Sequence, residues 1–120
     1  MGKSIKVYYK PTCTTCRKAI NKLNTRGMKF ELHDFFKEKL TKEELKSLLK
    51  RVGLSATDVL RRKDKMYKEL QLDTKKYSDD ELIELIVMNP GLLLRPIIVR
   101  GNKAVIANKE EIVEEFCKRG

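Results

Sequence analysis

The order in which strand-like and helix-like segments follow one another constrains the fold of this chain most. Residues 5–9 are a short β-prone run that ends in a turn at Lys10-Pro11-Thr12. A segment with apolar residues at helical spacing follows, and Gly27 is a plausible stop for it. Residues 29–33 then have the composition of a second strand. The chain therefore opens as strand, helix, strand.

A block of helices comes next, at about residues 41–90. Two of its helices are predicted to begin with capping boxes, Thr41 with Glu44 and Ser78 with Glu81. The predicted helices run from Thr41 to a stop at Gly53, from about Ser55 through Leu70, and from Ser78 through Ile86 to the turn at Asn89-Pro90-Gly91.

The last part of the chain returns to strand. Residues 96–99 and 104–106 are β-prone and flank a turn at 100–103, which predicts a hairpin. Asn108 with Glu111 forms a third capping box that opens a final helix. The whole order predicts an α/β fold: a thioredoxin-like mixed sheet in a single domain, residues 1–120, with the helical block inserted at about 41–90.

Charge and hydropathy narrow the function classes. The 27 Lys and Arg exceed the 17 Asp and Glu and give a net charge of +10, but the basic residues are interleaved with acids along the helices. This pattern indicates solvated faces, so we expect no direct nucleic-acid binding. Apolar runs are far shorter than the roughly 20 residues that span a bilayer, and the start lacks a signal-peptide pattern. We expect a cytoplasmic protein with no membrane association.

The cysteine pair Cys13-Thr14-Thr15-Cys16 carries the clearest chemical signal. It lies at the predicted strand-to-helix turn, where unpaired N–H groups and the helix dipole stabilise an anion. Such cysteines have pKa values of about 3.5–7.5 instead of about 8.5. Cys13 is predicted to be the exposed nucleophile, and the more enclosed Cys16 to resolve its adduct as a Cys13–Cys16 disulfide.

Two alternatives stay open for this pair, zinc binding and a pair of inert buried cysteines. A closed zinc site needs about four ligands, and His33 and Cys117 are the other candidates, neither in a second paired motif. We therefore expect no metal. His33 is interpreted as a strand residue and Cys117 as a packing residue of the last helix.

Four segments carry a resemblance to a known family: Tyr8 to Ala19 (YYKPTCTTCRKA), Leu60 to Lys63 (LRRK), Tyr67 to Leu70 (YKEL) and Asn89 to Val99 (NPGLLLRPIIV). Together they resemble the arsenate reductase and Spx family of thioredoxin-fold proteins, and the resemblance covers nearly the whole chain.

The resemblance implies a site around Cys13. It implies that Arg95-Pro96 is a cis peptide bond beside the cysteines, that Arg95 faces the nucleophile, and that Arg61 and Arg95 bind a small oxyanion. In the glutaredoxin-coupled arsenate reductases a cysteine matching Cys13 attacks arsenate. The resemblance therefore predicts a thiol oxidoreductase with no bound cofactor and with glutathione and glutaredoxin, or thioredoxin, as reductant.

Two positions differ from those enzymes. Asn108 stands where the family has a third arginine, and the glutathione-coupled enzymes generally lack a cysteine matching Cys16. The Cys-x-x-Cys pattern is typical of Spx proteins. The alternative function that the resemblance implies is therefore a redox-switched regulator that binds the C-terminal domain of the RNA polymerase alpha subunit.

Overall fold

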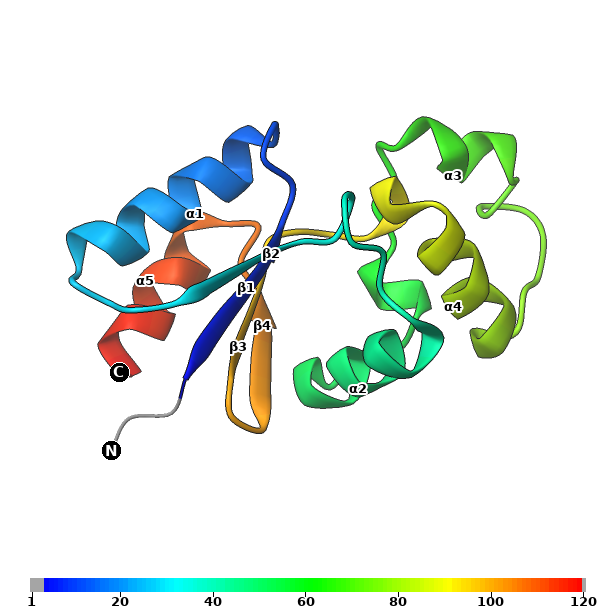
Figure 1. The fold of residues 1–120 in the computed structure, drawn as a ribbon. Helices are drawn as coiled ribbons and strands as arrows, with labels where there is room; N and C mark the ends of the chain where they lie inside the picture. Colours follow the sequence, from blue (N-terminus) through cyan, green and yellow to red (C-terminus); the bar gives the residue numbers. More distant parts are fainter. Residues whose placement is uncertain (1–3, 120) are drawn as a thin grey trace. The chain divides into compact units, whose positions relative to one another are not determined.

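The computed structural model describes residues 4–119, which fall into two compact units. The first unit joins the residues up to Glu38 with those from Arg95 onward, and the second comprises Lys39–Leu94. Figure 1 shows the course of the chain through both. Among the described helices, none combines the length with the apolar character that crossing a membrane requires.

Within the described residues, the first unit is built on a four-stranded sheet in the order β2-β1-β3-β4. Strand β1 pairs with β2 in parallel and with β3 antiparallel, and β3 and β4 form an antiparallel hairpin. The predicted mixed sheet is thereby confirmed, although the second strand begins two residues later than predicted. The strands are β1 (Ile5–Tyr9), β2 (Glu31–Asp34), β3 (Ile97–Arg100) and β4 (Lys103–Ile106).

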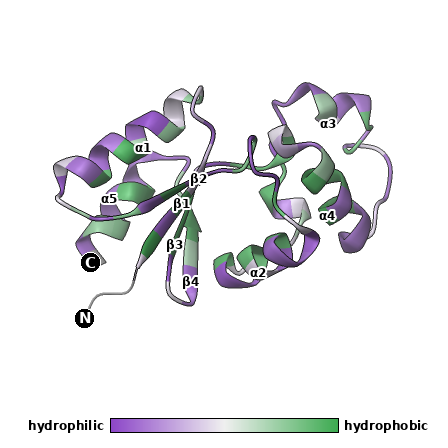
Figure 2. Cartoon of the chain, viewed as in Figure 1, coloured by the Kyte–Doolittle hydropathy of each residue, from purple (hydrophilic) through white to green (hydrophobic). Residues whose placement is uncertain are grey.

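Helices α1 (Thr14–Thr25) and α5 (Glu110–Arg119) pack together against the same face of this sheet (Figure 1). Figure 2 shows both hydrophobic and hydrophilic residues in each of these helices, as expected of amphipathic helices that bury one face. Lys22 Nζ ties the two helices together, 2.9 Å from Glu110 Oε1 and 2.7 Å from Glu114 Oε1. The core under them consists of Ile5, Val7, Ala19, Leu23, Ile98, Ala107, Val113 and Phe116.

The ends of these helices test two sequence predictions. The stop at Gly27 is confirmed, because this residue has a φ of +68° just beyond α1, a conformation that glycine adopts without strain. The Asn108 cap is wrong by one residue. Helix α5 starts at Glu110, and the carbonyl of Lys109 accepts from Ile112 and Val113, so Lys109 occupies the N-cap position.

The second unit is helical, as predicted. Its capping boxes at Thr41 and Ser78 are both present, and Gly53, with a φ of +81°, is the C-cap residue that follows α2. Helices α2 and α4 pack against each other. The helices of this unit are α2 (Lys42–Val52), α3 (Lys65–Glu69) and α4 (Asp79–Met88), with single 3₁₀ turns at Thr57–Val59 and Pro90–Leu92.

The single helix predicted from about Ser55 through Leu70 is wrong. The structure has a 3₁₀ turn, an extended segment and the short helix α3 there instead. Leu60 is extended and forms a β-bridge with Leu93, and the N–H of Arg61 donates to the carbonyl of Leu92. Pairing with residues 92–94 replaces the helical hydrogen bonds that the apolar spacing alone suggested, so tertiary contacts override the local pattern.

Asp64 connects this extended segment to the Asn89-Pro90-Gly91 turn. Its Oδ2 accepts from the N–H of Met66 and caps α3. A Cβ atom on Gly91 would lie 2.6 Å from Asp64 Oδ1, closer than real Cβ contacts come. The absence of a side chain at position 91 therefore leaves the space in which the capping carboxylate lies.

We predict that Gly91→Ala lowers the free energy of unfolding by about 1–2 kcal/mol, because the new methyl group displaces the Asp64 cap. Urea denaturation measures this cost, with Asp64→Ala as the matched background. Once the carboxylate has been removed, the same Gly91→Ala change should cost little. An equal cost in both backgrounds would contradict the assignment.

Candidate functional site

Cys13 is the N-cap residue of α1, and the loop before it is fixed to the first helical turn. The N–H of Cys13 donates to the carbonyl of Lys10 at 3.0 Å, and its own carbonyl accepts from Arg17 at 3.1 Å. Arg17 Nε also donates to the carbonyl of Pro11 at 3.0 Å. The Cys13 side chain is partly exposed. The loop therefore holds a reachable sulfur at the end of the helix where backbone N–H groups point outward.

Cys16 lies in the first turn of α1 and is fully buried. This confirms the prediction, made from the spacing, that the second cysteine is the more enclosed of the two. The two thiols interact directly, since each influences the titration of the other. Cys13, Cys16 and Cys117 are all free thiols in this structure.

The pKa of Cys13 is lowered below that of an ordinary cysteine. Burial acts in the opposite direction and is the largest single influence, but four favourable interactions outweigh it. The backbone N–H and the thiol of Cys16 stabilise the thiolate, and Arg95 stabilises it by a hydrogen bond and by its positive charge. The exposed sulfur is thus the one that ionises.

The pKa of Cys16 is raised to about 12, mainly by burial and further by the Cys13 thiolate beside it. The backbone N–H of Lys10 and the charge of Arg95 lower this pKa, but by less. A negative charge on one sulfur disfavours a negative charge on the other, so ionisation of Cys13 opposes ionisation of Cys16. The thiol of Cys16 stays protonated and donates to Cys13.

Arg95 and Pro96 lie in the same unit as the cysteines. Arg95 is only 7% exposed, and a guanidinium stays charged even when buried. The Arg95–Pro96 peptide bond is cis, and the carbonyl of Pro96 accepts from the N–H of Ala107 at 2.8 Å. The structure therefore brings Cys13, Cys16 and Arg95 together, with Pro96 next in the chain.

Phe36 and Lys10 belong to this site, and the sequence prediction assigned neither of them a role. The Phe36 ring centroid lies 5.4 Å from Arg95 Cζ and 4.6 Å from Lys10 Nζ. The signal available in the sequence was the Phe35-Phe36 pair at the end of a predicted strand. Phe35 is 1% exposed and belongs to the core, which leaves the second ring for another task.

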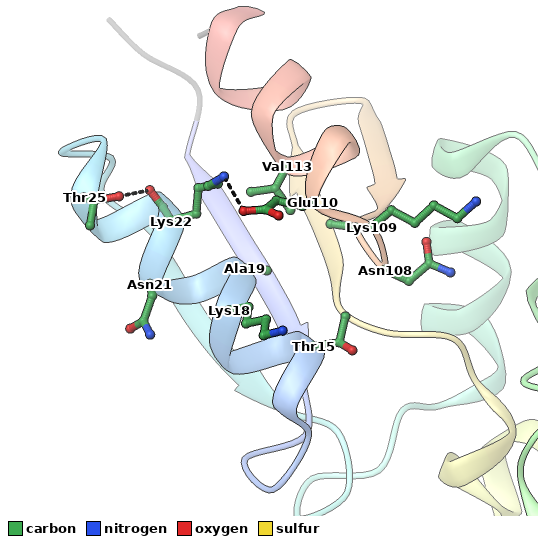
Figure 3. A pocket seen from close by; sticks show the side chains of 11 residues that line it. Thr15, Lys18, Ala19, Asn21, Lys22, Thr25, Asn108, Lys109, Glu110 and Val113 are labelled. Atoms are coloured by element: carbon green, nitrogen blue, oxygen red, sulfur yellow. Dashed lines mark hydrogen bonds and ion pairs between the residues drawn. The ribbon is translucent and has the colours of Figure 1, made fainter.

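A surface pocket of about 560 Å³ lies between α1 and the start of α5 (Figure 3). Asn108 lines it together with Thr15 from the Cys-x-x-Cys motif. The remaining lining residues are Lys18, Ala19, Asn21, Lys22, Thr25, Ala107, Lys109, Glu110 and Val113. An amide at position 108 offers hydrogen bonds but no positive charge.

Arg61 belongs to the other unit, Lys39–Leu94. Its Nη1 lies 3.8 Å from Asp64 Oδ1, and the same carboxylate caps α3. The Arg61 side chain is 35% exposed and so remains accessible to solvent.

His33 and Cys117, the other candidate residues, make contacts typical of structural residues. His33 is a residue of β2, as predicted; its ring lies 4.9 Å from that of Tyr8 and its Nε2 is 3.1 Å from the carbonyl oxygen of Glu38. Cys117 packs against the core under α5, also as predicted. Among residues 4–119, no three His, Cys, Asp or Glu side chains gather as metal ligands would.

We predict that iodoacetamide alkylates Cys13 with a pH midpoint below that of a free cysteine, because the thiolate is the reactive form. Cys16 should stay unreactive over the same range, because its pKa is raised and its sulfur is buried. Peptide-resolved mass spectrometry separates the two rates.

In the same experiment Arg95→Ala should raise the Cys13 midpoint, because it removes the hydrogen bond and the positive charge that stabilise the thiolate. Arg100→Ala is the matched control, because that guanidinium lies over Phe116, 4.2 Å from its ring centroid. A Cys13 midpoint at or above that of free cysteine would refute its assignment as the ionised sulfur.

Comparison with known proteins places this site in a family. The family model described as the ArsC family matches residues 8–116, from β1 to α5. Over 97% of its length the chain is 36% identical to an uncharacterized protein of Escherichia coli K12, YfgD, and covers 98% of that protein. It is also 32% identical, over 96% of its length, to the global transcriptional regulator Spx of Streptococcus mutans, of which it covers 84%.

Solved structures lead to the same family. An arsenate reductase from Vibrio cholerae superposes on the chain with a TM-score of 0.88 at 30% identity, covering 96% of this chain and 98% of that one. The shared fold confirms the thioredoxin-like α/β architecture predicted from the order of elements. The Cys13–Cys16 pair thus lies in a thiol oxidoreductase fold, and the chain belongs to the ArsC family.

Proposed function

We propose that this protein is a thiol oxidoreductase that reduces a small oxyanion, arsenate being the substrate to test first. One observation carries the proposal: an accessible Cys13 with a lowered pKa lies beside a buried Cys16 with a raised one and a buried Arg95. The choice of arsenate follows from the similarity to the arsenate reductase of Vibrio cholerae.

In the first step the Cys13 thiolate attacks the arsenic of arsenate. The new S–As bond forms as one As–O bond breaks, and the departing oxygen takes up protons and leaves as water. Arsenic stays in the +5 state. We expect the guanidinium of Arg95, which stabilises the thiolate before attack, to hold the oxyanion after the sulfur charge has been consumed.

In the second step Cys16 attacks the sulfur of Cys13. The S–S bond forms, the S–As bond breaks, and its electron pair reduces arsenic to the +3 state, which leaves as arsenite. Once Cys13 is bound to arsenic its negative charge is gone, so the hydrogen bond and the repulsion by which the Cys13 thiolate raises the pKa of Cys16 disappear, and burial remains. Ionisation of Cys16 is thereby favoured only after the first step.

Arg61 and Asn108 are the remaining candidates for substrate binding. From the family resemblance we propose that Arg61 is an oxyanion-binding residue, and that Asn108 offers a hydrogen bond where the resemblance implies a third arginine. Exchange of a cation for an amide weakens oxyanion binding, since charge-assisted hydrogen bonds contribute about 1.5–3 kcal/mol and neutral ones about 1. We also propose that residues 1–120 form one thioredoxin-like domain with a helical insertion at about residues 41–90.

The cycle ends with reduction of the Cys13–Cys16 disulfide by an external thiol, and the protein needs no bound cofactor. We propose thioredoxin rather than glutathione and glutaredoxin, because an internal disulfide forms without glutathione. Such a cycle requires a reducing compartment, and we propose the cytoplasm as its location.

The similarity to Spx supports a second candidate function. In this alternative the protein is a redox-switched regulator that binds the C-terminal domain of the RNA polymerase alpha subunit. The observation that favours it is the 32% identity to a global transcriptional regulator over 96% of the chain. The same Cys13–Cys16 pair would then act as a switch and not as a catalyst.

We predict arsenate-dependent NADPH consumption with thioredoxin and thioredoxin reductase, and slower consumption with glutathione, glutaredoxin and glutathione reductase. Cys13→Ser should abolish turnover. Arg95→Ala should lower kcat/KM roughly 10- to 100-fold, because it removes a charge-assisted contact to the oxyanion. Arg100→Ala serves again as the control and should leave turnover unchanged.

Two results would contradict the proposal. Turnover with glutathione and glutaredoxin that survives Cys16→Ser unchanged would show that Cys16 does not resolve the adduct. Absence of turnover, together with binding to the polymerase domain that depends on the Cys13–Cys16 redox state, would favour the regulator.

A further inference from the structure

Residues from three loops meet at the cysteine end of the sheet, around the ring of Phe36. Lys10 follows β1, Phe36 follows β2 and Arg95 comes shortly before β3. Because β1 and β2 are parallel and β3 is antiparallel to β1, these positions lie at the same edge of the sheet. Cys13 follows Lys10 at this edge.

The backbone fixes the position of this ring. Asp34 Oδ1 accepts from the N–H of Phe36 at 3.0 Å and from that of Lys37 at 3.2 Å, which holds the turn after β2. The preceding residue, Phe35, is anchored in the core, and its ring centroid lies 5.0 Å from that of Phe36. Phe36 is therefore a preformed aromatic surface.

Arg95 is the cation for which this surface matters most. Its guanidinium carbon lies 5.4 Å from the ring centroid, and the residue is 7% exposed. Cation–π contacts are stronger when the cation is desolvated, and a planar guanidinium stacks on aromatic faces. A long side chain loses rotational freedom about several bonds when it is fixed in one geometry. A ring that is already fixed therefore lowers the entropic cost of orienting the Arg95 side chain.

We propose that Phe36 is a positioning residue of this site: its ring orients the Arg95 guanidinium toward the Cys13 sulfur. The inference rests on the proposed function, in which Arg95 stabilises first the thiolate and then the bound oxyanion. In this role Phe36 acts on Cys13 through Arg95.

Lys10 shares the ring, with its Nζ 4.6 Å from the centroid, but it affects the cysteines in another way. Its carbonyl accepts from the N–H of Cys13, and its N–H acts on the sulfur of Cys16. Both are backbone interactions, which persist when the side chain is changed. The groups that stabilise the Cys13 thiolate are Cys16 and Arg95.

The test is the pH profile of Cys13 alkylation in the full chain, read by peptide mass spectrometry. Phe36→Leu removes the aromatic face while keeping an apolar side chain. At pH values below the midpoint of the profile, it should lower the rate of Cys13 alkylation roughly two- to fivefold. Phe36→Tyr keeps the ring face and should restore the wild-type profile. A general loss of packing would not be rescued in this way.

Coupling to Arg95 is measured by combining variants. In an Arg95→Ala background, Phe36→Leu should have no further effect, because the cation that the ring orients is gone. In a Lys10→Gln background the effect of Phe36→Leu should persist. A Phe36→Leu effect that survives loss of Arg95, or that vanishes with Lys10→Gln, would overturn the proposal.

Failure of the positioning role is distinguishable from failure of the proposed function. If Arg95→Ala raises the Cys13 midpoint and Phe36→Leu does not, the positioning role is wrong while the role of Arg95 stands. If Arg95→Ala leaves the Cys13 midpoint unchanged, the positioning role of Phe36 and the role of Arg95 in the proposed function are both wrong. Circular dichroism of each variant verifies that the fold is intact.

Discussion

The Cys13 sulfur is stabilised as an anion by two residues that lie far apart in the sequence, Cys16 and Arg95. The first turn of α1 supplies the N–H and thiol of Cys16, and Arg95 reaches the sulfur from the segment before β3. The central strand β1 makes this possible because it pairs with β2 on one side and with β3 on the other. The site therefore exists only when the sheet is assembled.

The two cysteines differ because the helix exposes one and buries the other. Cys13 precedes the helix and is partly exposed, whereas Cys16 faces the core and is fully buried. Burial favours the neutral thiol, and the adjacent thiolate reinforces this preference. This asymmetry sets the order of the proposed chemistry, with attack by Cys13 first and resolution by Cys16 second.

Much of this was predictable from the sequence, because the signals were local. The first strand, both capping boxes of the helical block, the hairpin and the greater enclosure of Cys16 each follow from neighbouring residues. The helix predicted over residues 55–70 failed because Leu60 pairs with Leu93, a partner remote in the sequence. Phe36 was missed for the same reason: its relation to Arg95 depends on how strands remote in the sequence pair within the sheet.

The proposed cycle depends on Cys13 and Cys16 forming one reversible disulfide, and mass spectrometry of the peroxide-treated protein tests this most directly. We expect a loss of two hydrogens confined to the peptide that contains both residues, restored by thioredoxin and absent in Cys16→Ser. Oxidation that joins Cys117 to either cysteine, or that yields only dimers linked between molecules, would contradict it.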